Sequence, residues 1–290
     1  MTTAAVINTV TADGLDVFYR EAGPIDAPVI LLLHGFPSSS HQFRNLIPIL
    51  APMYHVFAPD LPGFGFTVVS KSRNYQYTFA NLARTVEAFL DAVHIDKFAV
   101  YLFDYGAPTA LRVALCRPDK ITALIAQNGN SYVEGFGKDF WAPVMKYWKS
   151  GSQADRDALV PYALTFEATK TQYQFGSQQP WTIPPETYNL DWVLLSNATD
   201  QQHQLDLFYD YRTNVPLYKE FQEYFRSQQV PSLVVWGKND NIFPPVGAKL
   251  CKKDIADVEI RLLDAGHFAL ETNLHDVATL MLDFLKRKGI

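Results

Sequence analysis

The stretch FAVYLFDYGAPTALRVALC, residues 98–116, decides the fold. It opens with six consecutive apolar residues, Phe98–Phe103, which are followed by Asp104-Tyr105-Gly106 and then by the helix-forming segment Ala107–Cys116. A strand that is apolar on both faces is typical of a parallel sheet covered by helices, because neither of its faces meets water. Proline near the start of a helix, here Pro108, costs nothing because its missing N–H would be unpaired there. The stretch therefore predicts a buried strand, a sharp turn and a helix in direct succession.

The same alternation extends to both sides of this stretch. Apolar runs predict further strands at Val29–Leu33, Tyr54–Ala58, Ile121–Ala126, Ser232–Trp236 and Val258–Leu263. Helical spacing of apolar residues predicts helices at Thr78–Val93, Val246–Lys253 and Leu274–Lys286. We therefore predict an α/β fold with a doubly wound, mostly parallel sheet.

One long segment interrupts this alternation. Residues 132–225 hold 20 of the 40 Phe, Tyr and Trp residues of the chain. Most of these aromatic side chains must pack a helical insertion, and such an insertion between two halves of a sheet can also cover an active site. We expect residues 1–130 and 217–290 to form the core domain and residues 131–216 to form a helical cap insertion.

Composition excludes several classes of protein. The chain has 290 residues, of which 48% are apolar and 19% charged, so that it can bury a sizeable core. Its 25 basic and 30 acidic residues include no basic block, which argues against nucleic acid or an anionic membrane as the main partner. The start of the chain, MTTAAVINTV, lacks the pattern of a secretory leader, and no apolar run approaches the ~18 residues of a membrane helix. We expect a cytoplasmic protein, monomeric or homodimeric.

The sequence gives no sign of a metal or cofactor. Cys116 and Cys251 have no zinc-ligand spacing, and the chain contains neither a G-x-G-x-x-G motif nor a P-loop. We therefore expect no metal site and no cofactor.

Three polar residues follow predicted strands, and their order along the chain indicates a function. Ligands of open α/β sheets bind beyond the carboxyl ends of the strands, where Asp104, Asp240 and His267 occur. Taken singly, each has a plain structural interpretation: a helix cap, an Asx turn and a hydrogen-bonded structural histidine. Together they match the order nucleophile, acid, histidine of an α/β-hydrolase triad. Asn128, Asn130 and Glu134, just after another predicted strand, are alternatives to Asp240 as the acid.

Five motifs carry a resemblance to a known family: VILLLHGFP at 29–37, APDLPGFG at 58–65, FDYG at 103–106, WGKND at 236–240 and AGHF at 265–268. The chain resembles α/β-hydrolases of the branch that contains epoxide hydrolases, haloalkane dehalogenases and fluoroacetate-type haloacid dehalogenases. The resemblance implies the α/β-hydrolase fold and an oxyanion hole made by the backbone N–H groups of Phe36 and Tyr105. Leu102 departs from the pattern, since a smaller residue is usual two positions before the nucleophile.

Asp104 at the nucleophile position selects the reaction class. The chain has no G-x-S-x-G, and a carboxylate that attacked an ester carbonyl would form an unproductive anhydride. A carboxylate that attacks an sp³ carbon forms a stable alkyl-enzyme ester. His267, oriented by Asp240, would then activate the water that hydrolyses this ester. The expected substrate is a small apolar or amphipathic organic molecule, either an epoxide or a carbon–halogen compound.

The leaving group distinguishes these two substrates. The segment YRTN at 211–214 resembles the motif that carries the ring-opening tyrosine of epoxide hydrolases, and also the halide-side tyrosine of fluoroacetate-type enzymes. Tyr105 replaces the tryptophan of haloalkane dehalogenases and the arginine of fluoroacetate-type enzymes. We therefore favour epoxide hydrolysis, with Tyr211 as the proton donor. The expected lining of the substrate pocket is His34, Trp141, Tyr147 and Trp148, although packing alone also explains the last three.

Three other interpretations stay open. The runner-up is a haloalkane or haloacid dehalogenase. A second alternative is a non-catalytic or repurposed α/β-hydrolase that binds a small apolar ligand, although binding alone does not require Asp104, Asp240 and His267 together. The third is an esterase or lactonase that uses Ser38 or another hydroxyl group away from the turn.

Overall fold

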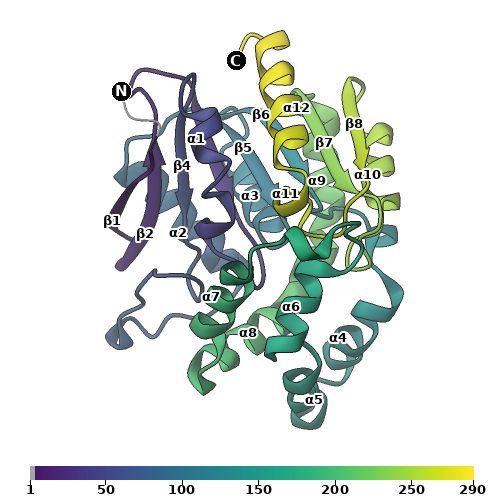
Figure 1. Cartoon of the computed structure of the whole chain (residues 1–290). Helices are drawn as coiled ribbons and strands as arrows, with labels where there is room; N and C mark the ends of the chain where they lie inside the picture. Colours follow the sequence, from purple (N-terminus) through teal and green to yellow (C-terminus); the bar gives the residue numbers. More distant parts are fainter. Residues whose placement is uncertain (1–3) are drawn as a thin grey trace.

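In the computed structural model, which describes residues 4–290, eight strands form one sheet in the order β1-β2-β4-β3-β5-β6-β7-β8 (Figure 1). The antiparallel pairs are β1 with β2 and β2 with β4, and the remaining neighbours are parallel. The strands are β1 Val6–Ala12, β2 Leu15–Ala22, β3 Val29–Leu33, β4 His55–Pro59, β5 Phe98–Phe103, β6 Ile121–Gln127, β7 Ser232–Gly237 and β8 Val258–Leu263. The predicted doubly wound, mostly parallel sheet is confirmed.

Helices cover both faces of the sheet, as the central strand requires. Val100 and Leu102 of β5 belong to a core that includes residues of α2, α3 and α9, whereas Tyr101 and Phe103 belong to the core on the other face with α1 and α12. Both faces of β5 are therefore buried, which explains its unbroken apolar sequence. The helices of this part of the chain are α1 Ile47–Leu50, α2 Phe79–Ala92, α3 Gly106–Cys116, α9 Asn214–Gln228, α10 Val246–Leu250, α11 Ala269–Thr272 and α12 Leu274–Arg287.

The inserted segment between β6 and β7 is helical. Its helices are α4 Lys138–Ser150, α5 Gln153–Ala163, α6 Phe166–Gln174, α7 Pro185–Leu195 and α8 Ala198–Asp210. They lie together below the sheet in Figure 1. The backbone N–H of Gly137 donates to Ile242 O, and the Asn239 side chain donates to Gly176 O. The inserted segment therefore contacts the loop that follows β7, at the carboxyl ends of the strands.

The end of the insertion merges with the core. The expected boundary at 216/217 lies within the first turn of α9. The Arg112 side chain of α3 donates to Asn214 Oδ1 and to Thr213 Oγ1, which fixes the start of α9 on the core.

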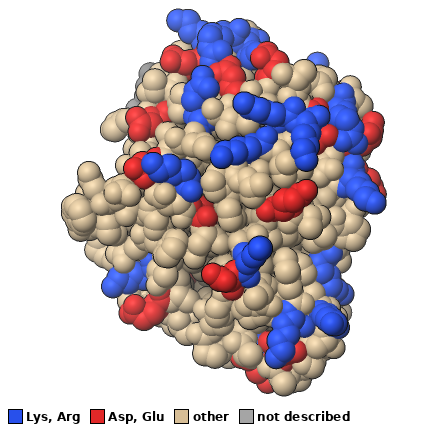
Figure 2. All heavy atoms as spheres, turned by 90° about the vertical axis from the view of Figure 1, so that its right-hand side faces the viewer, with Lys and Arg blue, Asp and Glu red and all other residues tan. Residues whose placement is uncertain are grey.

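The outer surface carries charges of both signs. On the face that Figure 2 shows, positively and negatively charged side chains lie next to one another at several places, with uncharged surface between them. Pairs on β8 and α12 include Arg287 with Glu259 at 2.6 Å. Among residues 4–290, no helix is long and apolar enough to cross a membrane.

Candidate active site

Asp104 occupies the sharp turn between β5 and α3. Its φ of +46° is in the left-handed region, which brings the end of the strand and the start of the helix close together. A Cβ at Gly106 would lie 2.4 Å from Leu33 O, and one at Gly35 would lie 2.3 Å from Asp104 Oδ1. The two glycines therefore allow β3 and its following loop to approach the turn. Asp104 is only 4% exposed.

Backbone N–H groups hold the Asp104 carboxylate. The N–H of Phe36 donates to Oδ1 at 2.7 Å. Burial raises the pKa of Asp104 to about 6, while His267 and hydrogen bonds from the backbone of Phe36 and Tyr105 oppose this rise. The residues expected to form an oxyanion hole are therefore the ones that contact the carboxylate.

His267 lies between the two carboxylates. Its Nδ1 is 2.8 Å from Asp240 Oδ2, and its Nε2 is 3.7 Å from Asp104 Oδ2. Because the Asp240 carboxylate can only accept, Nδ1 carries the proton and the Nε2 of the neutral ring is free to act as a base. Burial lowers the pKa of His267, but the attraction of Asp240 and Asp104 outweighs it, and the net shift is upward.

Asp240 is fixed by two further donors. The N–H of Ile242 donates to Oδ1, and the Asn128 side chain donates to Oδ2, both at 2.7 Å. Asn128 Oδ1 in turn accepts from Gly237 N–H at 2.9 Å. The Gln127 side chain donates to the carbonyl of His267 at 2.8 Å. The end of β6 thus holds both the acid and the histidine, a role that the sequence analysis did not assign to it.

The alternative acids lie elsewhere. Asn128 contacts Asp240 rather than the His267 ring. Asn130 closes a local turn with the backbone of Tyr132, and Glu134 is exposed. Asp240 is therefore the carboxylate that orients His267.

Tyr211 is fully buried in an aromatic cluster beside this site. Its hydroxyl lies 3.3 Å from that of Tyr218, and its ring is 5.8 Å from the ring of Tyr105. Burial raises the pKa of Tyr211 well above its ordinary value, with smaller contributions from Tyr218 and from the Asp104 carboxylate. The Tyr105 hydroxyl is also buried and has no hydrogen-bond partner within residues 4–290. Both phenols are therefore protonated at neutral pH and able to donate.

The two predicted pocket tryptophans use their N–H groups elsewhere. The indole of Trp141 donates to Ile242 O at 3.0 Å, and that of Trp148 donates to Phe208 O at 2.6 Å. Their rings instead surround Tyr211, at centroid distances of 4.8 and 6.0 Å.

Tyr147 and His34 also have structural partners. Arg156 donates to the Tyr147 hydroxyl at 3.1 Å, and the Tyr147 ring packs on Tyr209 within the insertion. His34 accepts from Leu61 N–H at Nε2, so its Nδ1–H donates to Gly35 O. Neither contact brings these two side chains to the Asp104 carboxylate.

Comparison with known proteins identifies the family. The α/β-hydrolase fold family matches residues 28–274, and the chain belongs to it. The chain is 45% identical over 269 residues to the uncharacterized hydrolase YNR064C of Saccharomyces cerevisiae, covering 92% of each protein. It is 37% identical over 207 residues to a haloalkane dehalogenase of Psychrobacter cryohalolentis, covering 64% of this chain and 68% of that protein.

A solved epoxide hydrolase, CorEH, has the same fold. It superposes with a TM-score of 0.80 at 19% identity, covering 98% of this chain and 99% of the other. The protein is therefore a hydrolase of the α/β family whose relatives in sequence and fold include haloalkane dehalogenases and an epoxide hydrolase.

Proposed function

We propose that this hydrolase attacks an sp³ carbon through an aspartyl alkyl-enzyme ester and that its substrates are epoxides, which it converts to diols. The observation that carries the proposal is the position of the Asp104 carboxylate, which lies on the strand–helix turn, accepts from Phe36 N–H and is 3.7 Å from His267 Nε2. Asp104, His267 and Asp240 form the proposed catalytic triad.

The first half-reaction forms the ester. Asp104 Oδ2 attacks the epoxide carbon, the C–O bond of the ring breaks, and Tyr211 donates a proton to the departing oxygen. The buried Tyr105 hydroxyl lies in the same aromatic cluster and supplies a further donor. A ring-opened alkyl ester of Asp104 results.

The second half-reaction releases the diol. His267 Nε2 takes a proton from water, and the hydroxide adds to the ester carbon of Asp104. The N–H groups of Phe36 and Tyr105 stabilise the oxyanion. Collapse frees the diol and restores the Asp104 carboxylate, while the proton on His267 returns to the Tyr211 phenolate through solvent. No step requires a cofactor.

The donors around the site favour an epoxide over a halide. An epoxide oxygen leaves as an alkoxide and needs a proton, which a phenol can supply. A halide leaves as an anion and needs only weak N–H or O–H donors. Trp141 and Trp148 donate to backbone carbonyls, whereas the hydroxyl of Tyr105 is unpaired within the described residues. Dehalogenation stays the second candidate because of the 37% identical haloalkane dehalogenase.

The inserted segment 131–216 acts as a cap in this proposal. It supplies Tyr211 from its last turn and covers the carboxyl ends of the strands. Its aromatic side chains favour a small apolar or amphipathic substrate.

The test is the intact mass of His267→Gln after exposure to epoxides, haloalkanes and haloacids. Without the base, the Asp104 ester should accumulate. A mass gain equal to a whole epoxide would support the proposal, whereas a gain equal to the substrate minus HX would replace it with dehalogenation. The matched control is His267→Gln with Asp104→Asn, which should gain no mass. If no compound adds mass to His267→Gln, the protein is better described as a ligand-binding α/β-hydrolase.

A further inference from the structure

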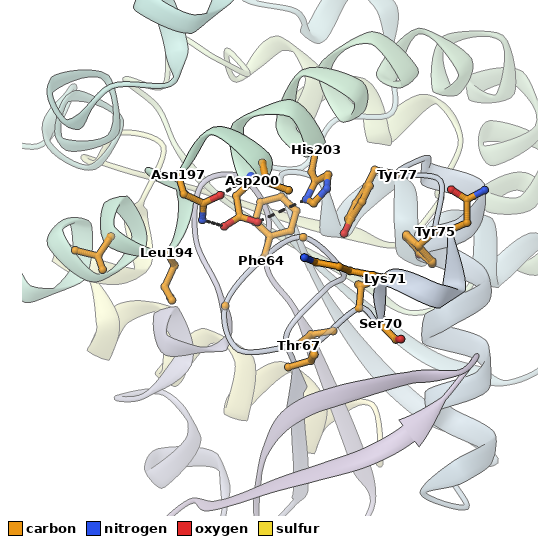
Figure 3. Close-up of a pocket in the computed structure, with 17 residues that line it drawn as sticks. Phe64, Thr67, Ser70, Lys71, Tyr75, Tyr77, Leu194, Asn197, Asp200 and His203 are labelled. Carbon is orange, nitrogen blue, oxygen red and sulfur yellow. Dashed lines mark hydrogen bonds and ion pairs between the residues drawn. The ribbon is translucent and has the colours of Figure 1, made fainter.

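A cavity of about 580 Å³ opens where the loop after β4 meets the cap helices α7 and α8 (Figure 3). Most of the loop residues between 63 and 77 line it, and the helices and the turn between them contribute six residues between 193 and 203. This volume falls within the usual range for small-molecule sites, which is roughly 300–1,000 Å³. None of the residues of the proposed triad lines it.

The cavity has an aromatic side and a polar side. Phe64 and Tyr77 line it from the loop, and the Tyr77 ring stacks on His203 at 3.8 Å between centroids. Asp200 lies 3.6 Å from His203 Nδ1, and Figure 3 shows Lys71 reaching into the same hollow. A ligand with an apolar body and one polar end would match both sides.

Phe64 connects this cavity to the proposed catalytic site. It lines the cavity, yet it is only 3% exposed because its ring packs inward. The ring lies edge-on to Tyr105 at 6.3 Å and to His34 at 5.3 Å. Since Tyr105 directly follows Asp104, Phe64 lies between the cavity and the aromatic cluster at the nucleophile.

The backbone on either side of Phe64 is held in place. Gly63 and Gly65 both have positive φ, and a Cβ at Gly65 would collide with the Asp60 carboxylate. The Gln204 side chain of α8 donates to Gly63 O at 2.8 Å, which ties this loop to the cap. The backbone of Phe64 is therefore fixed by contacts with both the core and the inserted helices.

We propose that this cavity is the vestibule through which the substrate reaches Asp104 and that Phe64 determines which substrates pass. The inference rests on the proposed function and extends it to the substrate, which is an amphipathic molecule whose electrophilic end passes Phe64 while its polar end stays near Lys71, Asp200 and His203. Phe64 acts as a specificity-determining residue, not as a catalytic one.

The test blocks the vestibule with a bulky label attached to a cysteine at its mouth. Val193 lines the cavity and is 66% exposed, so Val193→Cys offers a thiol at the mouth. The background carries Cys116→Ser, because Cys116 is exposed whereas Cys251 is buried. Labelling with pyrenyl maleimide should reduce kcat/KM for an amphipathic epoxide, such as an aryl glycidyl ether that carries a carboxamide at its far end, by about ten-fold or more. The matched control is Val246→Cys in the same background, labelled in the same way. Val246 lies on α10, is 40% exposed and does not line the cavity. Labelling this variant should leave kcat/KM unchanged.

A second variant tests Phe64 itself. Phe64→Ala should raise kcat/KM for a bulky branched epoxide relative to a small linear one by about ten-fold. Full activity of labelled Val193→Cys would contradict the proposed vestibule. An unchanged ratio of kcat/KM between the bulky and the small epoxide in Phe64→Ala would contradict it as well. No turnover by the unlabelled proteins would instead overturn the proposed function, and the access route with it.

Discussion

The Tyr105 side chain combines two features that seldom occur together, full burial and a hydroxyl without a partner among the described residues. A buried polar group without a hydrogen bond costs free energy, so its presence in a folded protein calls for an explanation. Phe79 and Tyr211 pack directly against its ring, at 4.9 and 5.8 Å. The hydroxyl is therefore held in a rigid aromatic environment beside the nucleophile.

Tyr105→Phe removes this hydroxyl and keeps the backbone N–H that contacts Asp104. We expect ester formation on Asp104 to slow by about ten-fold or more with an epoxide, because the departing alkoxide loses a donor. The measurement is the rate of mass gain in the His267→Gln background. Tyr211→Phe should slow ester formation more than Tyr105→Phe does, since Tyr211 is the proposed proton donor. Equal rates with and without the Tyr105 hydroxyl would show that this hydroxyl has no part in ring opening.

At the scale of elements, the end of β6 positions the proposed acid. Asn128 has a φ of +48°, and its side chain connects Asp240 to Gly237 of β7. Asn128→Gly keeps the left-handed backbone accessible and removes only the amide. We expect hydrolysis of the ester to slow by about ten-fold, because a hydrogen bond to a carboxylate contributes on the order of 1.5 kcal/mol.

The measurement is the decay of the ester after rapid mixing, followed by mass. The matched control is His94→Gly, because His94 also has a positive φ, of 58°, but is exposed and lies between α2 and β5. This control should leave ester decay unchanged. If Asn128→Gly slows ester formation instead, Asn128 acts on the nucleophile rather than on the acid.

The sequence predicted the buried elements well, and the reason is physical. Strands β3 and β5 have the predicted bounds, because a strand buried between two layers of helices must be apolar throughout. Strand β8 also has the predicted bounds, although it lies at the edge of the sheet and carries Glu259 and Arg261. The hairpin of β1 and β2 was not predicted. β1 lies at the edge of the sheet, and exposed residues such as Val6 and Ile7 interrupt the alternation that would have revealed it.

The site was predictable in part, for a similar reason. Asp104, Asp240 and His267 follow strands that meet at one edge of the sheet, so their order along the chain already indicated that they converge. The partners of Trp148 and Tyr147 depend on how the inserted helices pack on one another, which a single sequence does not specify. Asn128 could have been found from its place at the end of β6, next to β7 in the sheet.

At the scale of the whole molecule, the buried nucleophile weakens the fold at neutral pH. The pKa of Asp104 is raised from its ordinary 3.8 to about 6, so the folded state binds a proton there more tightly than the unfolded state. Stability therefore falls as pH rises from about 3.8 to about 6, and the loss is complete above that window. This loss of folding stability accompanies a nucleophilic carboxylate that is kept desolvated.

Asp104→Asn should remove this cost, since an amide at this position carries no charge and can still accept from Phe36 N–H. We expect its Tm to exceed that of the wild type by a few degrees at pH 7, on the order of 1–3 kcal/mol, with the difference disappearing near pH 4. Thermal unfolding of both proteins from pH 4 to 8 measures this. The exposed Asp26→Asn is the control for the change in net charge and should show no such pH-dependent gain. A variant as stable as the wild type at every pH would mean that hydrogen bonds and His267 fully compensate the burial of Asp104.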